Sequence, residues 1–452
     1  MKGIIIVAPR WLLLALLVFA PWAYGSVRTW TINVLNITMA SLLALWLTGC
    51  VMRRMKPIVP ALVWVAVGFL LLQGWWMTIN AQYYYDYAGQ KFVPISCLWS
   101  FAPGVLDRPH SLLMMYRITG LFGMLCFACD LAQRAEWRRR VAWTIAISGS
   151  ALILFGLVER SVGAHWFTWE DGRTSPMAFA SYFYSGNAGA FINLVLPLIG
   201  GFALRAIGAQ DGNAQRAIWI PALLIAIAGA LATASKAGTV ITFGLLLVLL
   251  LSQARVAAAL WQRLGSPALR IIAVTAVVVV VSAVALFGWD RMQMRWAQEP
   301  WVTGSWESRV LVYGVCWSMR TDSGLWGFGP GTFRLAFPFY TNPLGDKIEG
   351  TWRFAHEDYL QALIEWGWIG AGVAAVLFGG GVIAGCIGYW RRASLMTGFD
   401  RMFLFTIVLA LIGVALHATV DFPFQIPSLQ LYAAVYLGIA WGSRWWKAPR
   451  ET

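Results

Sequence analysis

The chain has 452 residues, of which 59% are hydrophobic and 12% are charged, and its mean hydropathy is +0.66. Charged residues make up about a quarter of an ordinary soluble domain, so this balance excludes a soluble globular protein. The formal net charge of +14 would suit a nucleic-acid-binding protein, but the Lys and Arg residues gather in short loops between apolar runs, so nucleic acid is not an expected partner.

Apolar runs long enough to cross a hydrocarbon core of roughly 30 Å recur along the whole chain. The sequence therefore predicts an all-α integral membrane protein with about twelve transmembrane helices, forming one polytopic membrane domain over residues 1–452. No convincing small-residue cleavage site follows the first run, so we expect a retained span rather than a signal peptide. The predicted spans are 11–24, 30–48, 58–77, 111–131, 141–158, 187–204, 217–233, 237–251, 271–288, 368–389, 402–420 and 427–441.

The charges of the loops predict the orientation of these spans. With the N-terminus in the cytoplasm, most of the 34 Lys and Arg residues fall in short cytoplasmic segments, as the positive-inside rule requires. Both termini are then cytoplasmic, and three longer segments lie on the opposite face, at 78–110, 159–185 and 289–365. Because functional residues concentrate on loops that a rigid scaffold holds, we expect the site on this non-cytoplasmic face, where 289–365 forms one large loop.

Two other kinds of protein receive little support. We find no repeat between the two halves and almost no carboxylates inside the spans, which argues against an ion-coupled transporter. No His/Cys cluster or paired-carboxylate motif indicates a metal, so we expect neither a metal nor a cofactor.

Cys97 and Cys316 both fall on the non-cytoplasmic side, where a disulfide between them is an open alternative to two free thiols.

Aromatic residues crowd the non-cytoplasmic segments, including the run Tyr-Tyr-Tyr-Asp-Tyr at 83–87. Such rings are typical of a membrane interface, and they also stack on sugars, so both interpretations stay open. In the large loop, residues 305–320 have a helical period. The glycines at 327, 329 and 331 predict a backbone corner with positive φ rather than a phosphate-binding loop, because no Gly-Lys-Ser/Thr follows them.

His356 is the first candidate for chemistry. The pattern from His356 to Trp366 is helical, with Tyr359 on the same face, and Gly367 is a plausible end of the helix. The positive end of a helix dipole disfavours an imidazolium ion, so this ring should be neutral and able to accept a proton from a hydroxyl. The free N–H groups of the same helix end favour a nearby phosphate. The alternative is a hydrogen-bonded interfacial histidine.

Cations on the same face are the candidates for binding a diphosphate. Arg309 opens the predicted helix of the large loop, and Lys236 lies in a tight turn between two spans, where a cation is costly without an anionic partner. Arginine binds phosphate through two parallel hydrogen bonds, whereas lysine acts as a point charge. Arg353 precedes His356 by three residues and is expected to lie close to it. The alternative for these cations is that they anchor the chain at the membrane interface.

Three further residues are weaker candidates for substrate binding. Asn187 lies at the start of the sixth span, where its side chain could bind substrate hydroxyls or merely cap the helix. Arg160 adds a cation at the start of the 159–185 segment, and Tyr359 follows His356 on the predicted helix face.

Four blocks of the chain, in order, resemble the O-antigen ligase and polymerase family. They are Tyr-Ser-Gly-Asn-Ala-Gly-Ala-Phe at 184–191, Ser235-Lys236 after the seventh span, Arg309 with Trp-Gly-Phe-Gly-Pro-Gly-Thr-Phe at 326–333, and Ala-His-Glu-Asp-Tyr-Leu-Gln-Ala-Leu-Ile-Glu-Trp-Gly at 355–367. The resemblance covers roughly residues 180–420. It implies a multi-span membrane glycosyltransferase of the GT-C type in the bacterial inner membrane. Such an enzyme takes a glycan from undecaprenyl diphosphate at the periplasmic face.

The resemblance also implies roles for individual residues. His356 would deprotonate or assist the acceptor hydroxyl, and Arg309 would bind the diphosphate. Lys236 stands where the family usually has arginine. The lysine keeps the positive charge but cannot form the bidentate hydrogen bonds of an arginine. Glu357 replaces the asparagine that commonly follows the histidine. Beside these, Arg353 is the third cation expected to stabilise the leaving group.

The implied reaction is inverting and metal-independent. Its partners are the lipid-linked donor, the surrounding membrane lipids and an acceptor. The acceptor is lipid A core in a ligase and another glycan repeat in a polymerase, and we expect the ligase. A flippase or exporter of lipid-linked glycans is the remaining alternative, which predicts cations along a central cavity rather than at the periplasmic rim.

Overall fold

The structure is a computed structural model, described over residues 2–163, 166–167, 177–208, 213–252, 266, 306–342, 348 and 352–446. It is mostly helical, and nine helices in these residues are long and apolar enough to cross a membrane, which supports the predicted helical membrane protein. One hairpin was not predicted from the sequence: β1 (Tyr83–Asp86) pairs antiparallel with β2 (Lys91–Pro94), with Tyr83 opposite Pro94.

Each predicted span in the described part of the chain coincides with a helix. The span predicted at 271–288 lies outside the described residues, so the count of twelve stays a prediction. The helices that match predicted spans are α1 (Lys2–Trp22), α2 (Thr29–Arg53), α3 (Ala61–Ile79), α4 (Arg108–Leu131), α5 (Ala135–Ser161), α6 (Ser185–Gly208), α7 (Asn213–Ala232), α8 (Lys236–Ser252), α13 (Asp358–Arg391), α14 (Gly398–His417) and α15 (Pro427–Gly442).

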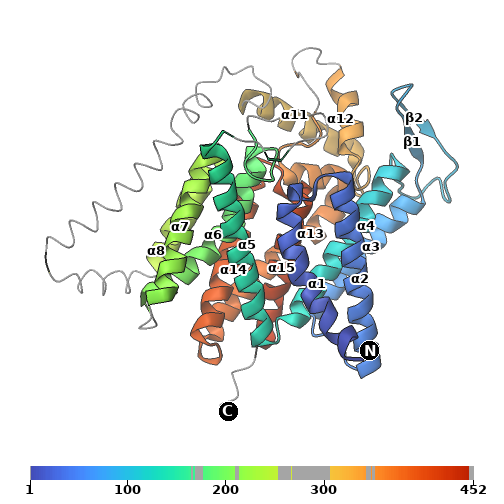
Figure 1. Cartoon of the computed structure of the whole chain (residues 1–452). Helices are drawn as coiled ribbons and strands as arrows, with labels where there is room; N and C mark the ends of the chain where they lie inside the picture. The colour runs from blue at the N-terminus through green and yellow to red at the C-terminus, as the bar shows by residue number, and fades with distance from the viewer. Residues whose placement is uncertain are drawn as a thin grey trace.

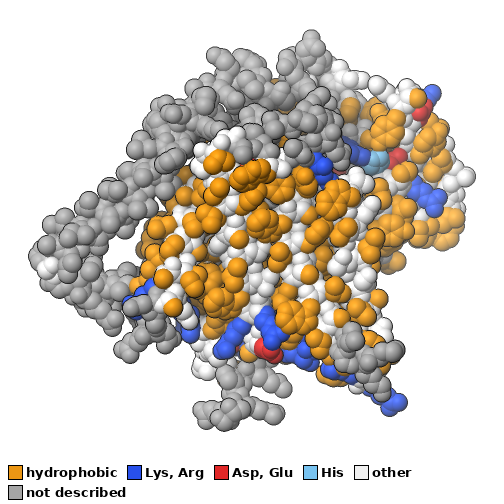
Figure 2. All heavy atoms as spheres, in the orientation of Figure 1, with side chains coloured by type: hydrophobic (Ala, Val, Ile, Leu, Met, Phe, Trp, Pro, Cys, Tyr) orange, Lys and Arg blue, Asp and Glu red, His pale blue; other side chains and the backbone are white. Residues whose placement is uncertain are grey.

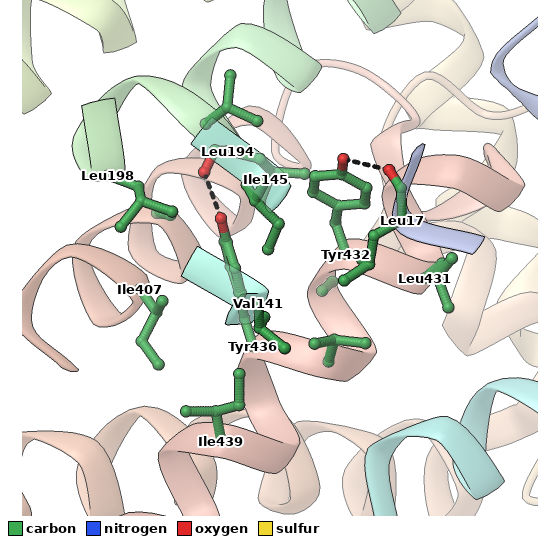
Figure 3. Packing of buried hydrophobic residues seen from close by; sticks show 14 of the residues in the cluster. Leu17, Val141, Ile145, Leu194, Leu198, Ile407, Leu431, Tyr432, Tyr436 and Ile439 are labelled. Atoms are coloured by element: carbon green, nitrogen blue, oxygen red, sulfur yellow. Dashed lines mark hydrogen bonds between the residues drawn. The ribbon is translucent and has the colours of Figure 1, made fainter. Parts of the chain in front are cut away.

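Helix α15 lies inside the bundle and buries every residue except Gln430. A helix that is apolar all round is typical of a core. Its two tyrosine hydroxyls donate to carbonyls of other helices, Tyr432 to Leu17 at 2.7 Å and Tyr436 to Leu194 at 3.1 Å (Figure 3). Because buried hydroxyls need partners, these two bonds tie α15 to α1 and α6.

The polar elements of the chain gather at one end of the bundle. Helices α11 (Trp306–Ser323) and α12 (Phe333–Thr341) lie there, and the hairpin stands beside them (Figure 1). The helix predicted at 305–320 is therefore confirmed as α11. Figure 2 shows apolar side chains covering the flank of the bundle and a group of Lys and Arg side chains at the opposite end. That arrangement suits the predicted orientation.

A close backbone contact joins the large loop to α13. Gly327, Gly329 and Gly331 have φ of 84°, 107° and 78°, so the predicted corner is confirmed. A Cβ on Gly327 would lie 2.3 Å from the carbonyl oxygen of Glu365, which only glycine permits. The sequence predicted that a helix ends at Gly367. Its φ is 66°, but α13 continues past it, so this residue is a kink inside the helix.

Candidate active site

His356 lies just before α13 and not inside it. Glu357 is the N-cap, since its side chain accepts a hydrogen bond from the backbone N–H of Leu360, and its extended backbone turns the chain away from the helix. His356 itself has a positive φ of 54°. The prediction that His356 shares a helical face with Tyr359 is therefore wrong. The backbone strain is held by Tyr313, whose hydroxyl donates to the carbonyl of His356 at 2.7 Å.

The charged group nearest the His356 ring is the carboxylate of Asp421. Nδ1 of His356 lies 3.3 Å from Oδ1 of Asp421. The side chain of Asp421 is 5% exposed and that of His356 is 19% exposed, so the pair lies at the edge of the buried core. This charge was not predicted from the sequence, where only the helix dipole was expected to act on the ring. The approach is an ion-pair contact and not a hydrogen bond, since Nδ1 has no hydrogen-bond partner among the described residues. A carboxylate on the Nδ1 side of the ring leaves Nε2 for a substrate, which is the arrangement of a general base.

Asp421 also faces a second histidine. Nε2 of His417, a fully buried residue, lies 3.8 Å from Oδ2 of Asp421. Burial would raise the pKa of Asp421, but the neighbouring His356 and His417 rings and the charge of Arg309 outweigh it and lower the pKa below its ordinary value. His417 was not among the residues predicted for the site. The available signal was its spacing of four residues from Asp421 at the end of a span.

Arg309 is bound to the same turn. One of its Nη atoms donates to the carbonyl of Val420, and the other donates to the hydroxyl of Tyr184 at 3.0 Å. Its Nε is buried and has no hydrogen-bond partner among the described residues. The guanidinium thus lies beside Asp421, with donors left over for an anion.

Aromatic rings surround the imidazole of His356. The ring centroids of Phe422, Trp352 and Tyr184 lie 4.6, 5.2 and 6.0 Å from it, each roughly edge to face. Tyr184 is also stacked on Phe422, with centroids 5.4 Å apart. These rings exclude water from one side of the base, which strengthens its interaction with Asp421.

The described segments that form this cluster are far apart in the chain. His356 follows the large loop, Arg309 comes from α11, Asp421 follows α14, and Tyr184 precedes α6. A family model described as O-Antigen ligase matches residues 221–375. This part of the chain is similar to an O-antigen ligase domain. Among curated proteins, none matches the chain.

The range that matches the family model includes some site residues and not others. It covers Lys236, Arg309 and His356, whereas Tyr184 and Asp421 lie outside the matched range. The candidate site is therefore completed by residues on both sides of the domain.

Asn187 lies in the first turn of α6, which approaches Asp421. A Cβ on the adjoining Gly186 would lie 2.1 Å from Oδ2 of Asp421, so the first turn of α6 touches this group. The side-chain oxygen of Asn187 is buried and has no hydrogen-bond partner among the described residues. In the described part of the chain this oxygen therefore caps no helix, and its role in substrate binding stays a prediction.

Lys236 and Arg160 meet at the turn between α7 and α8. Lys236 is the first residue of α8 and is exposed, and Arg160 donates to the carbonyl of Ala232 at the end of α7. A Cβ on Gly189 in α6 would lie 3.2 Å from the Cα of Gly238 in α8. Because these two helix starts touch, both cations lie at the end of the bundle that holds Asn187.

Two predicted residues are not brought to the imidazole. The hydroxyl of Tyr359 donates to the carbonyl of Ala415 at 2.8 Å, which directs the ring toward α14. Arg353 is exposed and makes no hydrogen bond or ion pair with the described residues. The expected closeness of Arg353 to His356 therefore finds no contact to support it.

Among the residues that the structure describes, no group of three or more His, Cys, Asp or Glu side chains is placed to hold a metal ion. Cys97 and Cys316 are free thiols, and Cys316 is buried in the cluster of α11 and α12.

Proposed function

We propose that the protein is a ligase-type glycosyltransferase of the bacterial inner membrane. It transfers a glycan from undecaprenyl diphosphate to a hydroxyl of lipid A core at the periplasmic face. The O-antigen ligase domain supports the class of reaction. The observation that carries the mechanism is the cluster in which Asp421 contacts His356 and lies beside Arg309.

His356 is the general base of this mechanism. The acceptor hydroxyl gives its proton to Nε2 of His356 while its oxygen bonds to the anomeric carbon of the donor sugar. The bond from that carbon to the diphosphate breaks, and its electron pair leaves with the diphosphate, so the configuration inverts. Asp421, on Nδ1, stabilises the imidazolium ion that forms.

Cations stabilise the departing diphosphate. Arg309 lies beside the base with an unpaired Nε, and Lys236 and Arg160 lie at the neighbouring turn. The exposed Arg353 is available from the loop. Because diphosphate is a good leaving group, positioning and charge stabilisation carry most of the rate acceleration. The amide of Asn187 is placed to bind a substrate hydroxyl.

The test is glycan transfer by the purified full-length chain in detergent. Undecaprenyl-diphosphate glycan is the donor, and lipid A core or further donor is the acceptor, with EDTA present throughout. We expect product on lipid A core from the wild type, and a loss of about 10²–10⁴-fold in His356→Ala.

The other outcomes separate the alternatives. Longer lipid-linked chains would identify a polymerase. An unchanged rate in folded His356→Ala protein would remove the base from the mechanism, and the absence of any product from the wild type would favour transport of the lipid-linked glycan.

A further inference from the structure

A second group of aromatic side chains lies away from His356, on the hairpin and α12. The rings of Tyr85, Phe92 and Phe339 form its centre, with centroids 5.2 Å apart between Tyr85 and Phe92 and 5.1 Å apart between Phe92 and Phe339. Tyr87 extends it, 5.0 Å from Tyr85. Tyr87 is 62% exposed and Phe339 43% exposed, so the group presents a surface, which we call the hairpin face.

A buried polar network fixes the edge of the hairpin face. Asp107 is 2% exposed, and its carboxylate accepts hydrogen bonds from the backbone N–H of Tyr85 at 2.8 Å and of His110 at 3.0 Å. It also contacts Nδ1 of His110 at 2.5 Å. On the other side of that ring, Nε2 of His110 meets the hydroxyl of Tyr87 at 3.1 Å and the guanidinium of Arg334. One imidazole therefore positions an exposed ring and an exposed cation together.

The protonation of this network follows from its donors. Arginine can only donate, so Nε2 of His110 accepts from Arg334 and Nδ1–H donates to Asp107. Burial would raise the pKa of Asp107, but the hydrogen bonds from His110 and Tyr85 lower it, so the carboxylate stays ionised. Arg334 is exposed at the edge of the hairpin face.

The hairpin face differs from an ordinary membrane anchor. Nearby, Leu98, Trp99 and Phe101 are 63%, 53% and 88% exposed in a stretch, 95–106, that has no charged residue. That composition suits a membrane interface. The hairpin face instead carries Asp86, Lys91 and Arg334 beside its rings, and charges of this kind are expensive in hydrocarbon. Figure 2 shows a histidine at the surface between basic and acidic side chains on this side of the molecule.

We propose that the hairpin face binds an oligosaccharide that carries phosphate, namely the acceptor glycan. Tyr87 and Phe339 would stack on the apolar faces of sugar rings, and Arg334 would bind the phosphate through two of its N–H groups. This inference rests on the proposed transferase function, because it assigns the acceptor of that same reaction. From the sequence, the aromatic residues of this face suit either a membrane interface or sugar stacking. The charged network beside Tyr85, Tyr87 and Phe339 favours sugar stacking for these rings.

The position of the hairpin face suits an acceptor site. Arg334 is the second residue of α12, just after the glycine corner, and Glu365 of α13 accepts hydrogen bonds from the backbone N–H groups of Gly331 and Phe333. Glu365 lies seven residues along α13 from Asp358, or about 10 Å of helix. Both sites are therefore fixed to the first turns of one helix, and one oligosaccharide can extend between them.

The test measures binding directly, without transfer. The probe is the lipid-free, phosphorylated core oligosaccharide released from lipopolysaccharide, titrated calorimetrically into the full-length chain in detergent. We expect binding by the wild type and an increase in Kd of about tenfold or more in Tyr87→Ala, Phe339→Ala and Arg334→Ala. Tyr87→Phe keeps the ring and should bind nearly as the wild type does.

The matched control is Phe101→Ala, which removes the most exposed ring outside the hairpin face and should leave Kd unchanged. His356→Ala should also bind normally while losing transfer, which separates this inference from the proposed function. Three results would overturn the inference: no binding by the wild type, an equal loss in Phe101→Ala, or displacement of the probe by anionic phospholipid. Equal affinity for the dephosphorylated probe would overturn the role of Arg334.

Discussion

Asp421 organises the candidate active site, because each of its oxygens faces a different imidazole and Arg309 lies beside it. An ionised carboxylate buried among apolar rings is stable only with such partners. In return, the carboxylate orients His356, whose free Nε2 is the atom that a general base needs. The geometry predicts that Asp421 matters nearly as much as the base itself.

Asp421→Asn tests this prediction. The amide keeps the size of the side chain but cannot stabilise an imidazolium ion, so we expect glycan transfer to fall by roughly 10²–10⁴-fold. Asp130→Asn is the matched control, since Asp130 also ends a span and instead accepts hydrogen bonds from Trp46 and the backbone N–H of Ile58. If Asp421→Asn transferred glycan at the rate of Asp130→Asn, the carboxylate would have no part in the reaction.

Glu357 predicts a dependence of stability on pH. Burial raises its pKa, and the hydrogen bonds from the backbone N–H groups of Leu360 and Tyr359 offset this only in part. The folded state therefore favours the protonated form. The protonated Glu357 carboxyl stabilises the folded state fully below its ordinary pKa of about 4.5. This stabilisation is lost as the pH rises through the raised pKa of the folded state.

Glu357→Gln should remove that dependence while keeping the oxygen that caps α13. We expect the variant to melt at a higher temperature than the wild type at pH 7.5, and the difference to shrink by pH 5. Thermal unfolding in detergent at both pH values measures it, with the exposed Glu136→Gln as the control for loss of one charge. A difference that grew toward pH 5 would contradict the sign.

At the scale of elements, the contact between the glycine corner and the kink of α13 positions the loop over the bundle. Glu365 holds the corner by accepting from two backbone N–H groups, and the side chain of Gln73 in α3 donates to the carbonyls of Trp326 and Trp366. The Gln73 side chain thus joins both the glycine corner and the kink to α3. It also gives the two buried carbonyls the hydrogen-bond donors that they need.

Gly367→Ala should disrupt this contact. Its φ of 66° is costly for alanine, by about 1–3 kcal/mol, and the new Cβ would lie 2.3 Å from the carbonyl oxygen of Leu325. We expect a lower melting temperature and reduced glycan transfer. Gly372→Ala on the same helix meets no atom within 4 Å and should be neutral or stabilising by about 0.5–1 kcal/mol. Equal melting temperatures for the two variants would show that the kink tolerates a side chain.

At the scale of the whole molecule, basic residues gather at one end and the hairpin, α11 and α12 at the other (Figures 1 and 2). The positive-inside rule predicts that the basic end faces the cytoplasm. In a cysteine-free variant, Ser100→Cys on the hairpin side should react with a membrane-impermeant maleimide in cells whose inner membrane is intact. Met55→Cys, exposed in the loop after α2, should react only after permeabilisation. The reverse pattern would invert the topology and move the site to the cytoplasm.

Much of this protein could be predicted from the sequence, because hydrophobic spans and local periodicity depend on neighbouring residues. The spans that the structure describes, α11 and the glycine corner all follow from patterns within a few tens of residues, and so does the choice of Arg309 and His356 as candidates. The hairpin was missed, since its strands are only four residues each and its charged and aromatic residues do not alternate by polarity.

Tertiary structure alone decided the partners of the candidate site. Arg309 meets Tyr184 across 125 positions and Val420 across 111, and the His356 ring meets Asp421 from a turn beyond another helix. The tertiary structure also places the Tyr359 hydroxyl against the carbonyl of Ala415. It brings Arg334 to His110, 224 positions away in the chain. Pairings of this kind depend on which helices pack side by side. The sequence by itself determined the spans and the residues able to do chemistry, and the packing of the bundle determined which of them meet.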